Sequence, residues 1–126
     1  MNLHLDTSVL IDSLTGSPPA PDPVAQQIRA GHRLSISTLV LYEWLRGPRT
    51  DAEQALRAQL FPDADLVVFG LEEALRAAAL YRALSRSRQR EVDIAIAACA
   101  IEHEAALWTL NPQDFKDIPG LRLYSG

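Results

Sequence analysis

Short apolar runs alternate along the chain with longer segments in which apolar residues recur at helical spacing. The short runs predict five strands, at 2–5, 34–37, 66–69, 106–109 and 121–124. The longer segments predict six helices, at 7–14, 23–30, 38–46, 51–60, 71–85 and 91–104. A proline-rich break at 16–21 separates the first two helices, and Gly47-Pro48 ends the third.

This alternation of strands and helices predicts an α/β fold. Consecutive parallel strands need crossover connections, so we expect a largely parallel sheet of four to five strands with helices on both faces. The sequence contains no internal repeat, low-complexity tract or linker, and we therefore expect one domain over residues 1–126. In such sheets functional groups gather at the carboxyl ends of the strands.

Composition is that of an ordinary globular protein, with 48% hydrophobic and 22% charged residues among 126. Cys99 is the only cysteine, so no internal disulfide is possible. No apolar run approaches the length of a membrane span, and the N-terminus does not resemble a secretory signal. These features predict a cytoplasmic protein that has no membrane partner.

The charge and the glycine spacing exclude several classes of anion-binding protein. The net charge is −4, whereas a protein that holds long nucleic acids by their backbone is usually basic. Lys116 is the only lysine, which excludes a P-loop, and no glycines follow the spacing of a dinucleotide-binding turn. Any anion must therefore be bound locally.

Four acidic residues stand at unusual places. Asp6 directly follows the first strand, Glu43 is the only charge in a seven-residue apolar segment, Asp93 opens a nine-residue apolar segment, and Asp114 follows the fourth strand. Each has a structural alternative: a helix cap for Asp6, a helix-dipole contact for Asp93, a solvated turn for Asp114, and a narrow exposed stripe for Glu43.

Their joint placement indicates more than these alternatives, because all four are expected at or beside one edge of the sheet. Carboxylates about 4 Å apart repel one another by roughly 4 kcal/mol at an effective dielectric constant near 20, so such a cluster calls for a cation. With oxygen ligands only, a hard ion such as Mg²⁺ or Mn²⁺ is favoured over Zn²⁺.

Four segments, at 5–11, 37–43, 92–100 and 109–115, resemble in order and spacing the four motifs of PIN-domain ribonucleases. The chain is similar to the VapC toxins of type II toxin–antitoxin pairs. This resemblance covers the whole chain and implies a PIN-like three-layer α/β/α sandwich and an endoribonuclease that needs Mg²⁺ or Mn²⁺. Its acidic core would be Asp6, Glu43 and Asp93, with Asp6 and Asp93 as metal ligands and Asp114 as the fourth acid.

The resemblance also implies supporting residues and partners. Thr7, Ser8 and Thr109 match hydroxyl or small polar positions beside the site, although they also suit helix capping and strand termination, and Asn111 occupies a position that is acidic in some relatives. Small proteins of this family pair with themselves and with an antitoxin, so we expect a homodimer and a VapB-like antitoxin. Tyr42, Trp44 and Leu45 are candidates for a partner interface, although Trp44 also suits the core.

A group of arginines offers a local site for RNA phosphates just before Asp93; alternatively these residues form a solvated face. They are Arg82, Arg86, Arg88 and Arg90. The resemblance and the acidic cluster together predict that metal-activated water hydrolyses an RNA phosphodiester bond, leaving a 5′-phosphate.

Three other classes were weighed against this hypothesis. A phosphotransferase of the haloacid dehalogenase type needs a second aspartate where Ser8 stands, and a signalling receiver domain needs a lysine farther from Asp114 than Lys116. The remaining alternative is a catalytically inactive PIN-like module that binds RNA or a protein. The intact acidic set argues against it, and a metal titration would separate the two.

Overall fold

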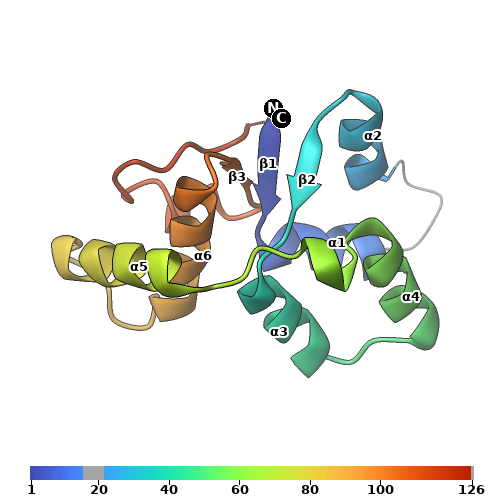
Figure 1. The fold of residues 1–126 in the computed structure, drawn as a ribbon, viewed down its shortest axis with the longest axis horizontal. Helices are drawn as coiled ribbons and strands as arrows, with labels where there is room; N and C mark the ends of the chain where they lie inside the picture. Colours follow the sequence, from blue (N-terminus) through green and yellow to red (C-terminus); the bar gives the residue numbers. More distant parts are fainter. Residues whose placement is uncertain (16–21, 126) are drawn as a thin grey trace.

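Three short parallel strands form the centre of the molecule. The computed structural model describes residues 1–15 and 22–125, so the predicted break at 16–21 lies outside the described residues. The strands are β1 (Asn2–Leu5), β2 (Arg33–Ser35) and β3 (Ala106–Trp108). Both outer strands pair with β1 in the order β2-β1-β3 (Figure 1). The predicted α/β class and parallel sheet are confirmed.

All six predicted helices are present, and two of them have the predicted bounds. They are α1 (Thr7–Thr15), α2 (Pro23–Arg29), α3 (Thr38–Arg46), α4 (Asp51–Leu60), α5 (Leu71–Ala83) and α6 (Glu91–Glu102). Two short 3-10 helices, η1 (Asp63–Asp65) and η2 (Pro112–Asp114), lie in the loops. Figure 1 places α5 and α6 together on one side of β1, and α1, α3 and α4 together on the other.

Side-chain caps explain why α3 and α4 begin where the sequence predicts. Ser37 Oγ accepts a hydrogen bond from Val40 N at 3.2 Å, which satisfies one of the free amides at the start of α3. At the start of α4, Thr50 and Glu53 form a reciprocal capping box. These caps are short-range features, so they can be read from the sequence.

The predicted count of four to five strands is wrong, because the described residues contain three. The segments predicted as strands at 66–69 and 121–124 each join the sheet through one parallel bridge, Ser37 with Val67 and Leu107 with Leu123. The first cannot extend because α3 begins at Thr38, one residue beyond Ser37. Both segments nevertheless run parallel to the strands that they bridge.

The sheet and α6 provide much of the core. Leu3, Leu5 and Leu107 are fully buried in the strands, and every residue of α6 from Ile94 to Ala100 is buried. This uniform burial explains why α6 is apolar on all sides instead of amphipathic. Within the part of the chain that the structure describes, no helix combines the length and the apolar character needed to cross a bilayer.

Candidate active site

Asp6 lies at the carboxyl end of β1, where the backbone turns into α1. Its amide donates to Trp108 O at 2.9 Å, and its side chain is almost fully buried. Carboxylate oxygen Oδ2 accepts hydrogen bonds from Thr109 Oγ1 at 2.8 Å and from Ser8 Oγ at 3.0 Å. The Asp6 side chain therefore does not cap α1, which was the structural alternative for this residue. Among the described residues, Oδ1 has no hydrogen-bond donor and is free to bind a cation.

Glu43 is held from two helices. Thr7 Oγ1, on α1, donates to Glu43 Oε1 at 2.5 Å, and Arg46 Nη2 lies 3.3 Å from Oε2. The Glu43 side chain is 17% exposed, so it is neither fully buried nor on an open stripe. Thr7 thus joins the first acidic motif to the second, and both oxygens of Glu43 are oriented before any ligand binds.

Asp93 lies in the first turn of α6, partly buried at the end of the apolar helix. The pKa of its carboxyl group is raised from 3.8 to about 6. Burial is the largest cause, and the negative charges of Asp6, Glu43 and Asp114 add to it. The positive charge of Arg90 acts in the opposite direction. Asp6, Glu43 and Asp114 are therefore close enough to Asp93 to act on it electrostatically, although the four acids come from four separate segments.

Asp114 and Asn111 belong to the turn after β3. Asp114 is the last residue of η2 and has an exposed side chain. Asn111 N donates to Thr109 Oγ1 at 3.0 Å, which ties this turn to the hydroxyl that also binds Asp6. Asn111 thus contributes its backbone to the site, and Asp114 contributes negative charge.

The donor chemistry of this cluster fits a hydrated hard cation better than a fully protein-enclosed one. Among residues 1–15 and 22–125, no three His, Cys, Asp or Glu side chains are close enough to form a ready-made ligand set. Mg²⁺ commonly needs only one or two carboxylates, and waters and substrate oxygens complete its coordination. The unpartnered Oδ1 of Asp6 and the raised pKa of Asp93 both suit such an ion.

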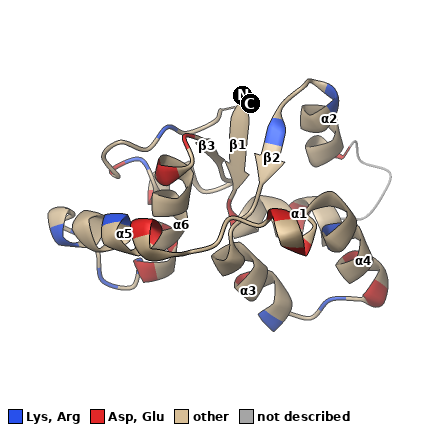
Figure 2. Cartoon of the chain, in the orientation of Figure 1, with Lys and Arg blue, Asp and Glu red and all other residues tan. Residues whose placement is uncertain are grey.

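The predicted arginines fall into two groups. Arg82, Arg86 and Arg88 are exposed at the end of α5 and in the loop to α6, where Figure 2 shows blue segments. Arg90 instead pairs with Asp117, with Nη2 2.7 Å from Oδ1. Asp117 was not predicted as a partner of Arg90, because the two residues lie 27 positions apart and nothing local in the sequence connects them.

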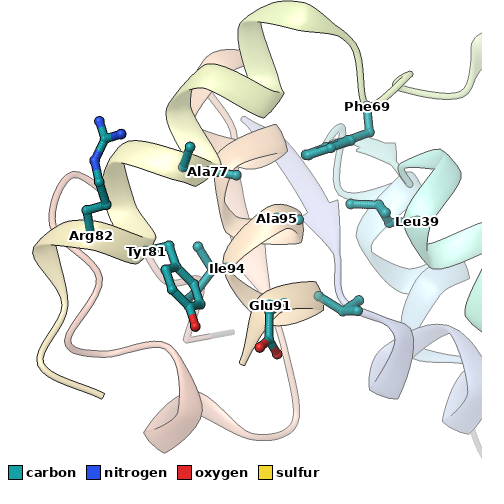
Figure 3. A pocket seen from close by; sticks show the side chains of 10 residues that line it. Leu39, Phe69, Ala77, Tyr81, Arg82, Glu91, Ile94 and Ala95 are labelled. Atoms are coloured by element: carbon teal, nitrogen blue, oxygen red, sulfur yellow. The ribbon is translucent and has the colours of Figure 1, made fainter. Parts of the chain in front are cut away.

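An apolar groove along α5 and the start of α6 was also not predicted. It has a volume of about 510 Å³ and is lined from α3, α5, α6 and the segment before α5. Figure 3 shows the side chains that line it, with Phe69 and Leu39 on one side, Tyr81 on the other, and Arg82 extending away from the groove. Four separate segments build it, so no single stretch of sequence indicates it.

The sequence matches the PIN domain model over residues 3–121. It is 34% identical over 121 residues to Ribonuclease VapC19 of Mycobacterium tuberculosis, a match that covers 94% of this chain and 95% of the relative. The fold is similar to that in the crystal structure of DNA-bound VapBC from Salmonella typhimurium, with a TM-score of 0.78, 22% identity, and coverage of 98% of this chain and 97% of that chain. A toxin–antitoxin complex from Klebsiella pneumoniae gives a TM-score of 0.69 at 27% identity, with 94% of each chain covered.

The chain therefore belongs to the PIN domain family. Within that family, 34% identity over nearly the whole length places it with the VapC ribonucleases.

Proposed function

We propose that this chain, as one PIN domain over residues 1–126, is a VapC-type toxin that cuts RNA internally with the help of Mg²⁺ or Mn²⁺. The observation that carries the proposal is the convergence of Asp6, Glu43 and Asp114 on Asp93, whose pKa is raised by burial and by these three negative charges. The relative named as a ribonuclease supports the same activity. In this proposal, the helices form the outer layers of a three-layer sandwich. The toxin acts in the cytoplasm, where RNA is abundant.

In this mechanism Asp6 and Asp93 would hold the cation. A bound Mg²⁺ or Mn²⁺ would activate water and offset negative charge on the phosphoryl oxygens. Ser8 and Thr109 bond to Oδ2 of Asp6, which leaves Oδ1 for the cation. Asp114 adds the fourth negative charge, and Asn111 keeps its turn attached to Thr109.

Glu43 orients the attacking water, because Thr7 and Arg46 hold its two oxygens in place. The water oxygen forms a bond to phosphorus as the bond from phosphorus to the 3′ oxygen breaks. One water proton goes to solvent through Glu43, and the 3′ oxygen takes up a proton. The products are a 5′-phosphate and a 3′-hydroxyl.

Arg82, Arg86 and Arg88 bind the phosphates that flank the cut. Guanidinium groups suit this task because they form two parallel hydrogen bonds with a phosphate and always carry charge. All three side chains are exposed; Arg82 is in the last turn of α5, and Arg86 and Arg88 lie on the loop that leads into α6, which carries Asp93. A local basic surface of this kind reconciles an RNA substrate with a net charge of −4.

A VapB-like antitoxin is the proposed partner at the apolar groove. The groove is apolar and is lined by residues of α3, α5 and α6, which suits an apolar segment of an antitoxin. The solved relatives described above include a toxin–antitoxin complex. For the proposed homodimer, Tyr42 and Leu45 on α3 are 60% and 49% exposed, whereas Trp44 is fully buried in the core.

Incubation of the purified protein with total cellular RNA, with and without Mg²⁺, tests the activity. We expect Mg²⁺-dependent internal cuts with 5′-phosphate ends, and loss of cleavage in Asp6→Asn and Asp93→Asn. Asp12→Asn, an exposed substitution on α1, is the matched control and should cleave normally. If a carboxylate variant cleaved as well as the parent, the mechanism would be wrong; binding of RNA without any cleavage would favour the inactive-module alternative.

A further inference from the structure

One guanidinium joins two loops that border the acidic cluster. Arg90 Nη2 lies 2.7 Å from Asp117 Oδ1 and Nη1 lies 2.9 Å from Oδ2, so the planar fork meets the carboxylate at two points. Nη2 also donates to Asp114 O at 2.8 Å, and Nη1 donates to Arg86 O at 2.6 Å. A single side chain thus ties the α5–α6 loop to the segment that follows β3.

These contacts leave little of Arg90 for a substrate. A guanidinium has five N–H groups, and the four on Nη1 and Nη2 already have acceptors. The Arg90 side chain is 19% exposed, whereas Arg86 and Arg88 lie open to solvent. The hydrogen bond to Asp117 raises the pKa of Arg90, and the pKa of Asp117 is lowered by the same contact. An RNA phosphate would have to displace Asp117 to reach this guanidinium.

What Arg90 adds to the segment after β3 is the position of its turn. Phe115 and Ile118 anchor that segment in the core, with 1% and 4% exposure. Asn111 N bonds to Thr109 Oγ1 at the start of the exposed turn that carries Asp114, and Arg90 adds a bond to the Asp114 carbonyl at its end. Arg90 also immediately precedes α6, three residues before Asp93. The same residue therefore connects the turn of Asp114 to the start of the helix that carries Asp93.

We propose that Arg90 is a positioning residue which, with Asp117 as its anchor, holds the turn of Asp114 beside Asp93. This inference rests on the proposed nuclease function, because the arrangement matters for cleavage only if these acids act in it. It replaces the expectation that Arg90 contacts RNA directly. Asp114 lies outside the two proposed metal ligands and adds negative charge beside them, and loss of such an outer contact around a metal typically lowers metal affinity or activity by about 10–100-fold.

Asp117→Asn is the variant that distinguishes positioning from substrate binding. It weakens the anchor but keeps the Arg90 cation. If Arg90 positions Asp114, kcat should fall about 10-fold or more, with KM within about threefold, and Arg90→Ala should behave in the same way. If Arg90 instead binds RNA, Asp117→Asn should leave kcat unchanged and lower KM, since it frees the guanidinium and removes a negative charge; that result would overturn the proposal.

Further variants exclude a general loss of structure. Asp117→Glu restores a carboxylate and should recover most of kcat, and Arg90→Ala/Asp117→Asn should be no worse than Arg90→Ala alone because both changes break one contact. Arg122→Ala removes an exposed arginine elsewhere and serves as the control. Additive losses, or no recovery in Asp117→Glu, would contradict the positioning role.

The Mn²⁺ affinity of the RNA-free protein, measured by calorimetry, separates this inference from the proposed activity. We expect it to fall about 10-fold in Asp117→Asn and to stay at the parental value in Arg122→Ala. If the parent bound Mn²⁺ but cut no RNA, the nuclease proposal would fail while the Mn²⁺ comparison would still decide the role of Arg90. Equal Mn²⁺ affinity in the parent and in Asp117→Asn would refute the positioning role of Arg90.

Discussion

Replacing Asp93 by asparagine should make the metal-free protein more stable while abolishing cleavage. The folded protein raises the pKa of this carboxyl group from 3.8 to about 6, so the folded state binds its proton more tightly than the unfolded state does. Ionisation therefore opposes folding. The cost is absent below about pH 4, grows as the pH rises through the folded pKa near 6, and is constant above it. Asparagine keeps the shape of the side chain and carries no charge at any of these pH values.

The size of the effect follows from the same shift. A change of about two pKa units corresponds to at most about 3 kcal/mol, and because Asp93 is only half-buried we expect about 1–2 kcal/mol after allowing for solvent screening. For a domain of 126 residues, this gives a rise in Tm of about 5 °C at pH 7.5. Cleavage should fall to background, since a metal-binding carboxylate is lost.

Thermal and urea unfolding of the parent, Asp93→Asn and the exposed control Asp12→Asn in the presence of EDTA would measure this difference. Between pH 7.5 and 4 the advantage of Asp93→Asn should disappear, and the control should differ from the parent by less than about 0.5 kcal/mol throughout. Addition of Mn²⁺ at about 100 times its Kd should stabilise the parent by about 2.7 kcal/mol and reverse the order. An Asp93→Asn protein that is less stable than the parent in EDTA at pH 7.5 would refute the idea of an electrostatically strained cluster.

Three further outcomes are expected. Burial lowers the pKa of His4 from 6.5 to about 4, so its contribution to stability is complete above pH 6.5 and declines by up to about 3 kcal/mol as the pH falls to 4. Urea unfolding of Asp93→Asn, in which the Asp93 carboxyl group cannot offset this change, should record the loss. If His4→Gln in the same background kept the same pH dependence, His4 would not be its cause. Thr7→Val removes the hydroxyl that holds Glu43 and should lower kcat by about 10–100-fold, whereas Thr15→Val, whose hydroxyl bonds to Ile11 O of its own helix, should not; equal rates in steady-state assays would argue against the orienting role. Arg88→Ala should weaken RNA binding and reduce by about one the slope of log Kd against log salt concentration, and an unchanged slope would exclude a phosphate contact.

Helix positions were predictable from the sequence because their signals are local. Ser37 and Thr50 cap the following helices through atoms only three residues away, and Gly47-Pro48 stops α3 where predicted. Strand length was overestimated for the opposite reason. The apolar character of 66–69 and 121–124 is real, but how far a ladder extends depends on where the neighbouring segment leaves the sheet, and nothing within 66–69 or 121–124 records that position.

In the candidate site, too, local features were predictable from the sequence and long-range contacts were not. Asp6, Glu43 and Asp93 were noticeable because each is an isolated charge at the border of, or within, an apolar segment, and the carboxyl ends of parallel strands and their following helices converge. The contact between Arg90 and Asp117 was not predictable, since it depends on how two exposed loops meet after folding. The sequence therefore indicated which acids come near one another, while the orientation of each carboxylate came only from the structure.

The complete burial of α6 has a consequence for how this protein tolerates change. Between Ile94 and Ala100 the helix is enclosed on every side, so it cannot slide or rotate without disturbing packing all around it. Enlarging one of its alanines, for example Ala97→Leu, would displace α6 and move Asp93, at its first turn, relative to Asp6. Heat or mutations that loosen this interior should therefore lower activity before the protein unfolds.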